Sequence, residues 1–247
     1  FEFTPQSPNK LYIGYPRPIE RKEGEKQFLI SAFESNKLPV DFLEWCKYFE
    51  VIILPSEWCK KVFQDNGVTT PIEVMIQGTD NFNIIEHTSK VPFTFLHYNA
   101  FSDYKRKGWD LVTQAFIDMF GRDENVQLIL KGRKHDNEDD IKEIPVRPNI
   151  KVIIQNMKRG ELVKLQDQAH CFVFPSRGEG IGLPPIEMMA RGIPTIVTNW
   201  SGMSEFAEMA IPINSFARVE AHYDLPFDGS AGQWIEPNVH ILKDTMF

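Results

Sequence analysis

Apolar runs typical of buried strands alternate with helix-like segments along most of the chain. In Trp109–Phe120, apolar residues recur at intervals of three and four and Gly121 follows them, which is typical of a helix with one buried face. Strands are predicted at Leu11–Tyr15, Phe49–Leu54, Ile72–Ile76, Phe93–Tyr98, Val126–Leu130, Lys151–Ile154, Cys171–Phe174 and Pro194–Thr198. Helices are predicted at Glu57–Asn66, Trp109–Phe120, Gly160–Gln168 and Pro185–Arg191. This alternation predicts βαβ units, and therefore an α/β fold with parallel sheets buried on both faces.

One stretch interrupts the pattern. Residues Asp80–Pro92 are polar and contain no clear element, so we place a domain junction there. The predicted domains are residues 1–88 and residues 89–247. The pattern also weakens after Pro212, and Phe216–Gly232 is expected to be irregular.

The composition and charge of the chain limit the kinds of molecule that it is expected to bind. The chain has 247 residues, 42% hydrophobic and 25% charged, which is typical of a globular protein. We expect no transmembrane segment, because no apolar run is long enough, although peripheral contact with a membrane is compatible with the sequence. The net charge is −7 and no basic block occurs, so we expect no general nucleic-acid binding. A local basic cleft for a small phosphorylated ligand is compatible with that charge.

The cysteines and acidic residues do not predict a metal site. Cys46, Cys59 and Cys171 are odd in number and share no zinc-binding spacing, which favours a reducing, cytoplasmic compartment. The acidic run Asp136–Asp140 is not spaced to close around an ion, so we interpret it as a solvated loop.

The segment richest in candidate chemistry is PSRGEGIGLPPIE, which ends at Glu187. Its glycines Gly178, Gly180 and Gly182 form a predicted turn between the carboxyl end of a strand and a helix that opens with two prolines. Backbone N–H groups and the positive end of the helix dipole at such a turn favour a phosphate or diphosphate.

Two glutamates, Glu179 and Glu187, flank this turn. A carboxylate repels an anion unless it binds something else, such as sugar hydroxyls. Alternatively, both glutamates have a structural role only, with Glu179 as a turn residue and Glu187 interacting with the helix dipole. The residues alone leave both interpretations open.

The order of motifs resembles the retaining GT-B glycosyltransferases, the group 1 or family 4 type. The E-x7-E spacing from Glu179 to Glu187 stands in PSRGEGIGLPPIEMMARGIPTIVTNWSGMSEF, which resembles the family's main motif. The segments RKGWDLVTQAF, LILKG and ILPSEWCKKVFQDNGV resemble its other motifs, and together the matches span residues 30–206. The resemblance implies a GT-B fold, with a Rossmann-like donor-binding domain at residues 89–247 and a partial or shortened Rossmann-like, acceptor-side domain at residues 1–88.

The resemblance also implies roles for site residues. Glu179 would lie beside the donor sugar and the leaving phosphate, and Lys107 would neutralise the diphosphate, so these two are the catalytic candidates. Glu187 would accept hydrogen bonds from the ribose hydroxyls. The remaining donor-binding candidates are Gly180, Ile181, Gly182, Arg106, Gly132, Arg133 and Glu205.

The chain departs from the family's pattern in two places. After the strand Phe93–Tyr98 the family usually carries a Gly-Arg pair, whereas this chain has Asn99, Ala100 and Phe101, so Lys105 or Arg106 would have to supply the second charge. Residues 1–88 show no recognisable glycine loop and no acceptor-side histidine, and neither His97 nor His135 substitutes for that histidine.

The resemblance therefore predicts a retaining, metal-independent glycosyltransferase with no cofactor. Its donor would be a nucleotide-diphosphate sugar, and its acceptor a glycan, lipid or protein. One alternative is a non-catalytic nucleotide-sugar-binding half that needs a partner chain or a missing segment. Another is a GT-B-fold epimerase or phosphorylase, but the extra acid–base residues of the first and the pyridoxal-binding lysine segment of the second are not visible.

Overall fold

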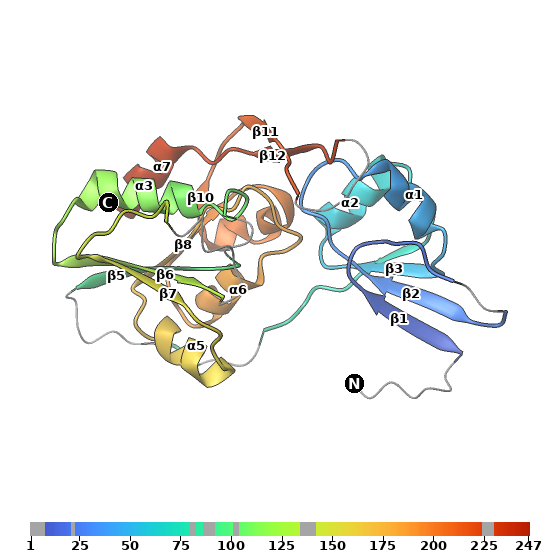
Figure 1. Ribbon diagram of the computed structural model, residues 1–247, viewed down its shortest axis with the longest axis horizontal. Helices are drawn as coiled ribbons and strands as arrows, with labels where there is room; N and C mark the ends of the chain where they lie inside the picture. The colour runs from blue at the N-terminus through green and yellow to red at the C-terminus, as the bar shows by residue number, and fades with distance from the viewer. Residues whose placement is uncertain are drawn as a thin grey trace.

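The protein folds as two halves, each built on a parallel β-sheet (Figure 1). The computed structural model describes residues 8–20, 23–79, 83–85, 92–100, 104–133, 142–223 and 230–247. The acidic run Asp136–Asp140, His135 and Phe101 lie outside the described residues.

The first half is a four-stranded sheet in the order β1-β2-β3-β4, with all neighbours parallel. The strands are β1 (Asn9–Ile13), β2 (Lys26–Ile30), β3 (Val51–Leu54) and β4 (Ile72–Val74). Helices α1 (Val40–Cys46) and α2 (Glu57–Asp65) lie against one face (Figure 1). Aromatic and aliphatic side chains fill the space between, among them Leu29, Phe33, Phe42, Ile52 and Phe63.

The second half is a six-stranded parallel sheet in the order β10-β9-β8-β5-β6-β7. The strands are β5 (Phe93–Tyr98), β6 (Val126–Gly132), β7 (Ile150–Ile154), β8 (Cys171–Phe174), β9 (Thr195–Thr198) and β10 (Ile211–Ile213). From β5 the sheet continues through β6 to β7, and from β8 it continues in the opposite direction through β9 to β10. The point between β5 and β8 is therefore a topological switch, where open α/β sheets bind ligands.

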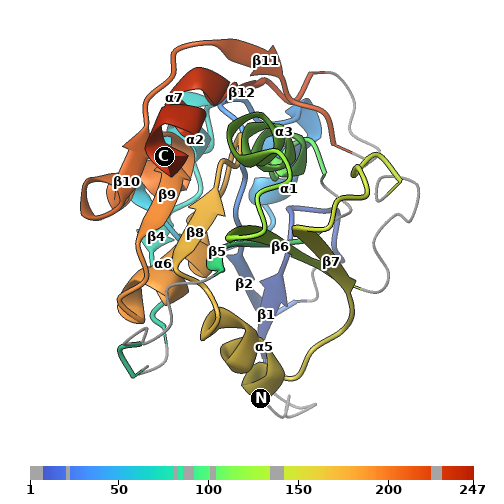
Figure 2. The same cartoon turned by 90° about the vertical axis from the view of Figure 1, so that its left-hand side faces the viewer.

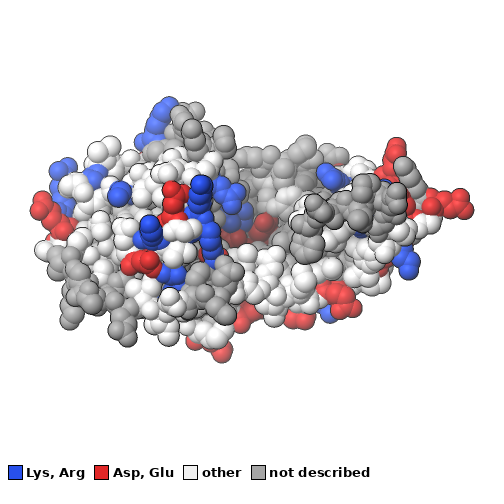
Figure 3. All heavy atoms as spheres, turned by 90° about the horizontal axis from the view of Figure 1, so that it is seen from below, with Lys and Arg blue, Asp and Glu red and all other residues white. Residues whose placement is uncertain are grey.

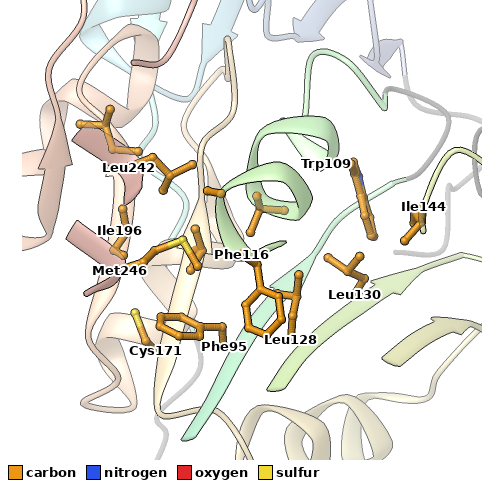
Figure 4. Packing of buried hydrophobic residues seen from close by; sticks show 14 of the residues in the cluster. Phe95, Trp109, Phe116, Leu128, Leu130, Ile144, Cys171, Ile196, Leu242 and Met246 are labelled. Carbon is orange, nitrogen blue, oxygen red and sulfur yellow. The ribbon is translucent and has the colours of Figure 1, made fainter. Parts of the chain in front are cut away.

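Helices cover both faces of the second sheet. Helix α3 (Trp109–Phe120) and the terminal helix α7 (Val239–Met246) pack on one face, and α5 (Arg159–Gln166) and α6 (Leu183–Ala190) on the other (Figure 2). Under α3 and α7, the rings of Trp109, Phe116 and Phe95 interlock with aliphatic residues of β6 and β9 (Figure 4). This packing holds the carboxyl ends of the strands, and the loops that follow them, in a fixed arrangement.

The C-terminal part of the chain returns to the first half. Strands β11 (Arg218–Glu220) and β12 (Gln233–Ile235) pair antiparallel. Gln233 exchanges hydrogen bonds with Asn36, at 2.8 and 3.3 Å. The Tyr223 ring stacks on Phe33 with the centroids 5.1 Å apart. Residues distant in sequence thus complete the core of the first half.

The predicted α/β class is confirmed, and every predicted strand and helix overlaps an observed element, with the same bounds for β5, β8 and α3 and shifted bounds for the others. Elements that the pattern did not predict are β2, α1, β10, β11, β12 and α7. The expected cover on both faces is wrong for the first sheet within the described residues, because its outer face leaves Leu11 41% and Ile13 79% exposed. The boundary between residues 88 and 89 stays a prediction. No helix in the described segments has the length and apolar character to span a bilayer.

Candidate functional site

A cavity of about 560 Å³ lies where the carboxyl ends of both sheets meet. The first half lines it with residues at or after its four strands, including Gly14, Tyr15, Ser31, Glu34 and Met75. The second half lines it with Asn99, Arg133, Glu179, Gly180, Ile181, Gly182, Leu183, Pro184 and Glu187. The location beside the switch between β5 and β8 is where an open α/β sheet is expected to take a ligand.

The turn after β8 approaches the first half so closely that two of its positions require glycine. A Cβ on Gly178 would lie 2.1 Å from the Glu34 carbonyl oxygen, and one on Gly180 would lie 2.7 Å from the Ala32 Cβ. The Ser56 hydroxyl, which also caps α2, donates to the Gly180 carbonyl at 2.6 Å. These glycines therefore serve contact between the halves, a reason the sequence did not reveal.

The same turn leaves backbone donors open. Within the part of the chain that the structure describes, the N–H groups of Gly180, Ile181 and Gly182 donate to no protein acceptor. Helix α6 begins directly after Gly182, which has a φ of +87° that glycine adopts without strain. Open N–H groups at a helix start are suited to an anion.

Behind the turn lies a buried charge cluster. The Lys107 Nζ donates to both carboxylate oxygens of Glu179, at 2.8 and 2.9 Å. The Ser176 hydroxyl donates to the same carboxylate at 2.8 Å. Arg106 lies with Nη1 3.6 Å from Glu179 and donates to the Gly178 carbonyl at 2.9 Å. All three charged residues are less than a tenth exposed.

The cluster holds Glu179 in its charged form. Burial alone raises the pKa of Glu179, but Lys107 and then Arg106 oppose it, so the pKa ends below its usual value. Burial lowers the pKa of Lys107, and the neighbouring Arg106 lowers it further against the pull of Glu179. We take the paired, charged state as the relevant one, because three hydrogen bonds to the carboxylate favour it.

Arg106 also reaches the first half. Its Nη1 lies 3.7 Å from Glu34 Oε1, and Glu34 in turn accepts a hydrogen bond from the Tyr15 hydroxyl at 3.0 Å. One guanidinium group is therefore flanked by a carboxylate from each half.

Glu187 lies on the wall of the cavity in a separate network. Its Oε2 accepts from the Tyr98 hydroxyl at 3.0 Å, and its Oε1 accepts from Arg159 at 2.8 Å. Gln166 donates to Tyr98 at 2.8 Å and supports the arrangement. The Tyr98 hydroxyl and the Arg159 guanidinium thus hold Glu187 toward the cavity rather than in solvent.

Of the other predicted site residues, some line the cavity and some do not. Arg133 lines the cavity directly after Gly132, which ends β6. Lys107 and Arg106 lie behind the lining rather than in it. Glu205 lies outside the lining and accepts a hydrogen bond from the Trp58 N–H of α2 at 2.8 Å, so its predicted role in donor binding stays a prediction.

Two features of the site were missed from the sequence. Tyr15 and Glu34 belong to no recognised motif. Arg177 donates to Asp110 of α3 and to Glu236, which directly follows β12, and so ties the glycine turn to both elements, although the sequence shows no sign of this pairing. Seen from below, Lys and Arg side chains gather on the second half beside the hollow between the halves, where acidic side chains also lie (Figure 3). No group of three or more potential metal ligands occurs among the described residues.

Known proteins share this fold and part of this sequence. The E. coli serotype-specific mannosyltransferase WbdA is 31% identical over 107 residues, which cover 42% of this chain and 13% of WbdA. The crystal structure of TarM matches 91% of this chain and 43% of its own, with a TM-score of 0.66 and 14% identity. A mutant of S. aureus TarM, in complex with Fondaparinux, alpha-GlcNAc-glycerol and UDP, matches 74% of this chain and 39% of its own, with a TM-score of 0.59 and 16% identity. This chain therefore spans less than half the length of these relatives.

A family model completes the comparison. The model described as "Glycosyl transferases group 1" matches residues 82–215, which include β5 to β10 and the glycine turn. The arrangement of two parallel sheets around one cavity agrees with the GT-B fold of the structural neighbours. The chain belongs to the glycosyl transferases group 1 family and has a GT-B fold.

Proposed function

We propose that this chain transfers a sugar from a nucleotide-diphosphate sugar to an acceptor hydroxyl, with retention of configuration and without a metal ion or cofactor. The observation that carries the proposal is the buried Lys107–Glu179 pair directly behind the open N–H groups of the glycine turn. That pairing places a cation, a carboxylate and free donors at one end of a cavity large enough for a nucleotide sugar.

The proposed donor fits the chemistry of the second half. The diphosphate accepts hydrogen bonds from the N–H groups of Gly180, Ile181 and Gly182, and the ribose hydroxyls donate to Glu187. Arg133 lies near the base. UDP in the TarM complex supports a nucleotide in this type of fold, because TarM shares the arrangement of both halves.

Transfer breaks the bond between the anomeric carbon and the diphosphate oxygen, and negative charge grows on the diphosphate. The acceptor oxygen forms the new bond to the anomeric carbon, and its proton passes to the departing diphosphate. The turn N–H groups and the two buried cations stabilise that charge. Loss of a single fixed donor of this kind costs about 2.7–4 kcal/mol of barrier lowering. The ionised Glu179 favours the positive charge that develops on the sugar.

A second candidate is a nucleotide-sugar-binding half that needs a further segment for turnover. It is favoured by the exposed outer face of the first sheet and by the share of WbdA and TarM that the chain spans.

The test is a thermal-shift screen with UDP-, GDP-, ADP- and TDP-sugars. We expect one nucleotide series to raise the melting temperature, because a ligand that binds the folded state alone stabilises it. Within that series, the nucleoside diphosphate should bind more tightly than the nucleoside, since the turn binds phosphate. No shift with any series, or equal affinity for diphosphate and nucleoside, would contradict the proposed site.

A further inference from the structure

Glu34 is the charged residue that the first half contributes to the cavity within the described ranges. Its side chain is 13% exposed and its carboxylate lies on the cavity wall after β2. The rest of the lining from this half is apolar or neutral and includes Ile13, Ile30 and Ile53. The binding preference of this side of the cavity therefore depends on one carboxylate.

The position of Glu34 is set by its surroundings. Its backbone is in close contact with Gly178, and its carboxylate accepts from the Tyr15 hydroxyl at 3.0 and 3.3 Å. Tyr15 itself lines the cavity and packs edge-on against Phe33. A carboxylate held this way needs little reorganisation when it binds a ligand.

The carboxylate has acceptor capacity to spare. An ionised carboxylate offers about four lone-pair positions. Among the described residues, the Tyr15 hydroxyl supplies the hydrogen bond to Glu34, whereas Arg106 Nη1 stays at 3.7 Å, beyond hydrogen-bond distance. Glu34 can therefore accept hydrogen bonds from a ligand in the cavity.

The charges around Glu34 decide which donors fit. Arg106 Nη1 lies 3.7 Å from Glu34 Oε1, and its positive charge disfavours an ammonium group beside that carboxylate. A phosphorylated group would meet the negative charge of Glu34, and no Lys or Arg of the first half's described residues lines the cavity to balance it. Uncharged hydroxyl groups remain.

We propose that Glu34 and Tyr15 bind the acceptor, and that the acceptor group they hold is an uncharged sugar or polyol. This inference rests on the proposed function, because it assigns the second substrate of the same cavity. The position suits the role, since the Arg106 guanidinium group that flanks Glu34 also flanks the donor-side Glu179.

The experiment measures acceptor and donor binding separately. Methyl α-D-mannopyranoside, glycerol and mannose 6-phosphate are titrated by NMR into protein saturated with UDP or GDP, whichever stabilises it. The variants are Glu34→Gln and Tyr15→Phe. Matched controls are Glu44→Gln, whose side chain is 71% exposed, and Tyr48→Phe at the surface.

We expect the two neutral probes to bind and mannose 6-phosphate to bind at least about tenfold more weakly. Glu34→Gln should weaken methyl mannoside binding about tenfold, and Tyr15→Phe about two- to tenfold, while the controls change nothing. The Glu34→Gln variant should bind nucleotide at least as tightly as the wild type, because the Glu34 carboxylate no longer competes with the nucleotide for Arg106.

Three results would overturn the inference: no binding of either neutral probe, tighter binding of the phosphorylated sugar, or unchanged affinity in both variants. If Glu34→Gln fails to fold, Tyr15→Phe decides. Failure of the wild-type chain to bind any nucleotide would instead overturn the proposed function. In that case the probes are titrated into the protein without nucleotide. A lower probe affinity in Glu34→Gln than in the wild type would still support this inference, and an equal affinity would overturn it.

Discussion

Glu179 separates Lys107 from the cavity, because the Lys107 Nζ donates to both oxygens of that carboxylate and Lys107 is not part of the cavity lining. The motif predicted a direct role at the diphosphate. The structure places a carboxylate between the lysine and the cavity, and the two residues are 72 positions apart in sequence. A one-dimensional motif does not contain that pairing. We therefore expect the charge of Lys107 to act on the proposed donor as part of a cluster with Arg106 and Glu179.

Replacement of Lys107 by Met should reduce the free energy of unfolding by about 3–5 kcal/mol, because Glu179 is then left buried without its main partner. The double variant with Glu179→Gln should recover part of that loss. Urea unfolding measures both, with Lys164→Met on the exposed face of α5 as the control. A Lys107→Met variant as stable as the wild type would show that the pair is not formed in solution.

Glu187→Gln should weaken nucleotide-sugar binding by about 1.5–3 kcal/mol, the range for a hydrogen bond to a charged group. The fold should persist, because Tyr98 can still donate to the amide oxygen. Calorimetry gives the affinity, and Glu208→Gln at an exposed position is the matched control. Equal affinity in the Glu187 variant would leave Glu187 as a structural partner of Tyr98 and Arg159.

At the residue scale, the motifs located the part of the site that lies in one continuous segment. Gly180, Ile181, Gly182 and Glu187 line the cavity as a run from turn to helix. Tyr15 and Glu34 could not be found in the same way, since their position depends on packing between the two halves. Their functional roles, like those of the predicted residues, stay predictions.

At the element scale, α2 and the glycine turn are joined through one side chain. Ser56 accepts from the Cys59 N–H as the cap of α2 and donates to Gly180 across the halves. The start of α2 is further held by Glu205. The first turn of α2 thus positions the turn that carries the open N–H groups.

Ser56→Ala should destabilise the protein by about 1–2 kcal/mol through the lost cap, and should also weaken nucleotide binding. Asn238→Ala is the matched control, because Asn238 caps α7 without a contact across the cavity. We expect the control to lose stability with nucleotide affinity unchanged. Thermal unfolding and calorimetry separate the two effects, and a Ser56 variant with unaltered nucleotide affinity would remove the link.

His97 joins β5 to β8 and should make stability depend on pH. It is fully buried and its Nδ1 lies 2.7 Å from the Val173 carbonyl. Burial lowers its pKa from 6.5 to about 4, so the unfolded chain takes up the proton first as the pH falls. Neutral, buried His97 therefore contributes fully to the free energy of unfolding above pH 6.5. That free energy falls by about 3 kcal/mol as the pH falls to about 4.

His97→Asn should remove that part of the pH dependence, and His240→Asn at an exposed position of α7 should not. Chemical unfolding between pH 4 and 7 measures the difference. Parallel curves for wild type and His97→Asn would mean that His97 already titrates near its ordinary value in the fold.

Elements with a strong local pattern were predicted, and elements made by distant partners were not. Strand β5 and helix α3 have the predicted bounds because their apolar spacing is unambiguous. Strand β11 has three residues and exists through pairing with β12 across a long connection, so no local signal marks it. Helix α1 has seven residues, too few for a clear period.

At the scale of the whole molecule, the two halves differ in how completely helices cover their sheets. Helices cover both faces of the second sheet, whereas described helices cover one face of the first. The predicted donor residues belong to the second half, and the residues that we propose to bind the acceptor, Glu34 and Tyr15, belong to the first.

We therefore expect the 247-residue chain on its own to bind a nucleotide sugar but to transfer it slowly. Correct orientation of the acceptor accounts for about 7–11 kcal/mol of barrier lowering in well-ordered sites. The predicted donor-binding residues, in contrast, all lie in the second half. Incubation with radiolabelled nucleotide sugars and a mixed pool of acceptors measures transfer. Turnover in the range of about 1–10³ s⁻¹ would show that the first half is a complete acceptor domain.

The return of the chain through β11 and β12 limits how the halves can move. The chain passes from the first half to the second between β4 and β5, and it returns through β11 and β12, where Tyr223 and Gln233 contact the first half. A body tied to another at two separated points keeps one easy degree of freedom, rotation about the line through those points. The close contact of Gly178 with Glu34 across the halves opposes a change in their separation during such a rotation. Opening of the cavity for substrate exchange would then separate the halves at positions far from that line, while the charge cluster of Arg106, Lys107 and Glu179 stays assembled.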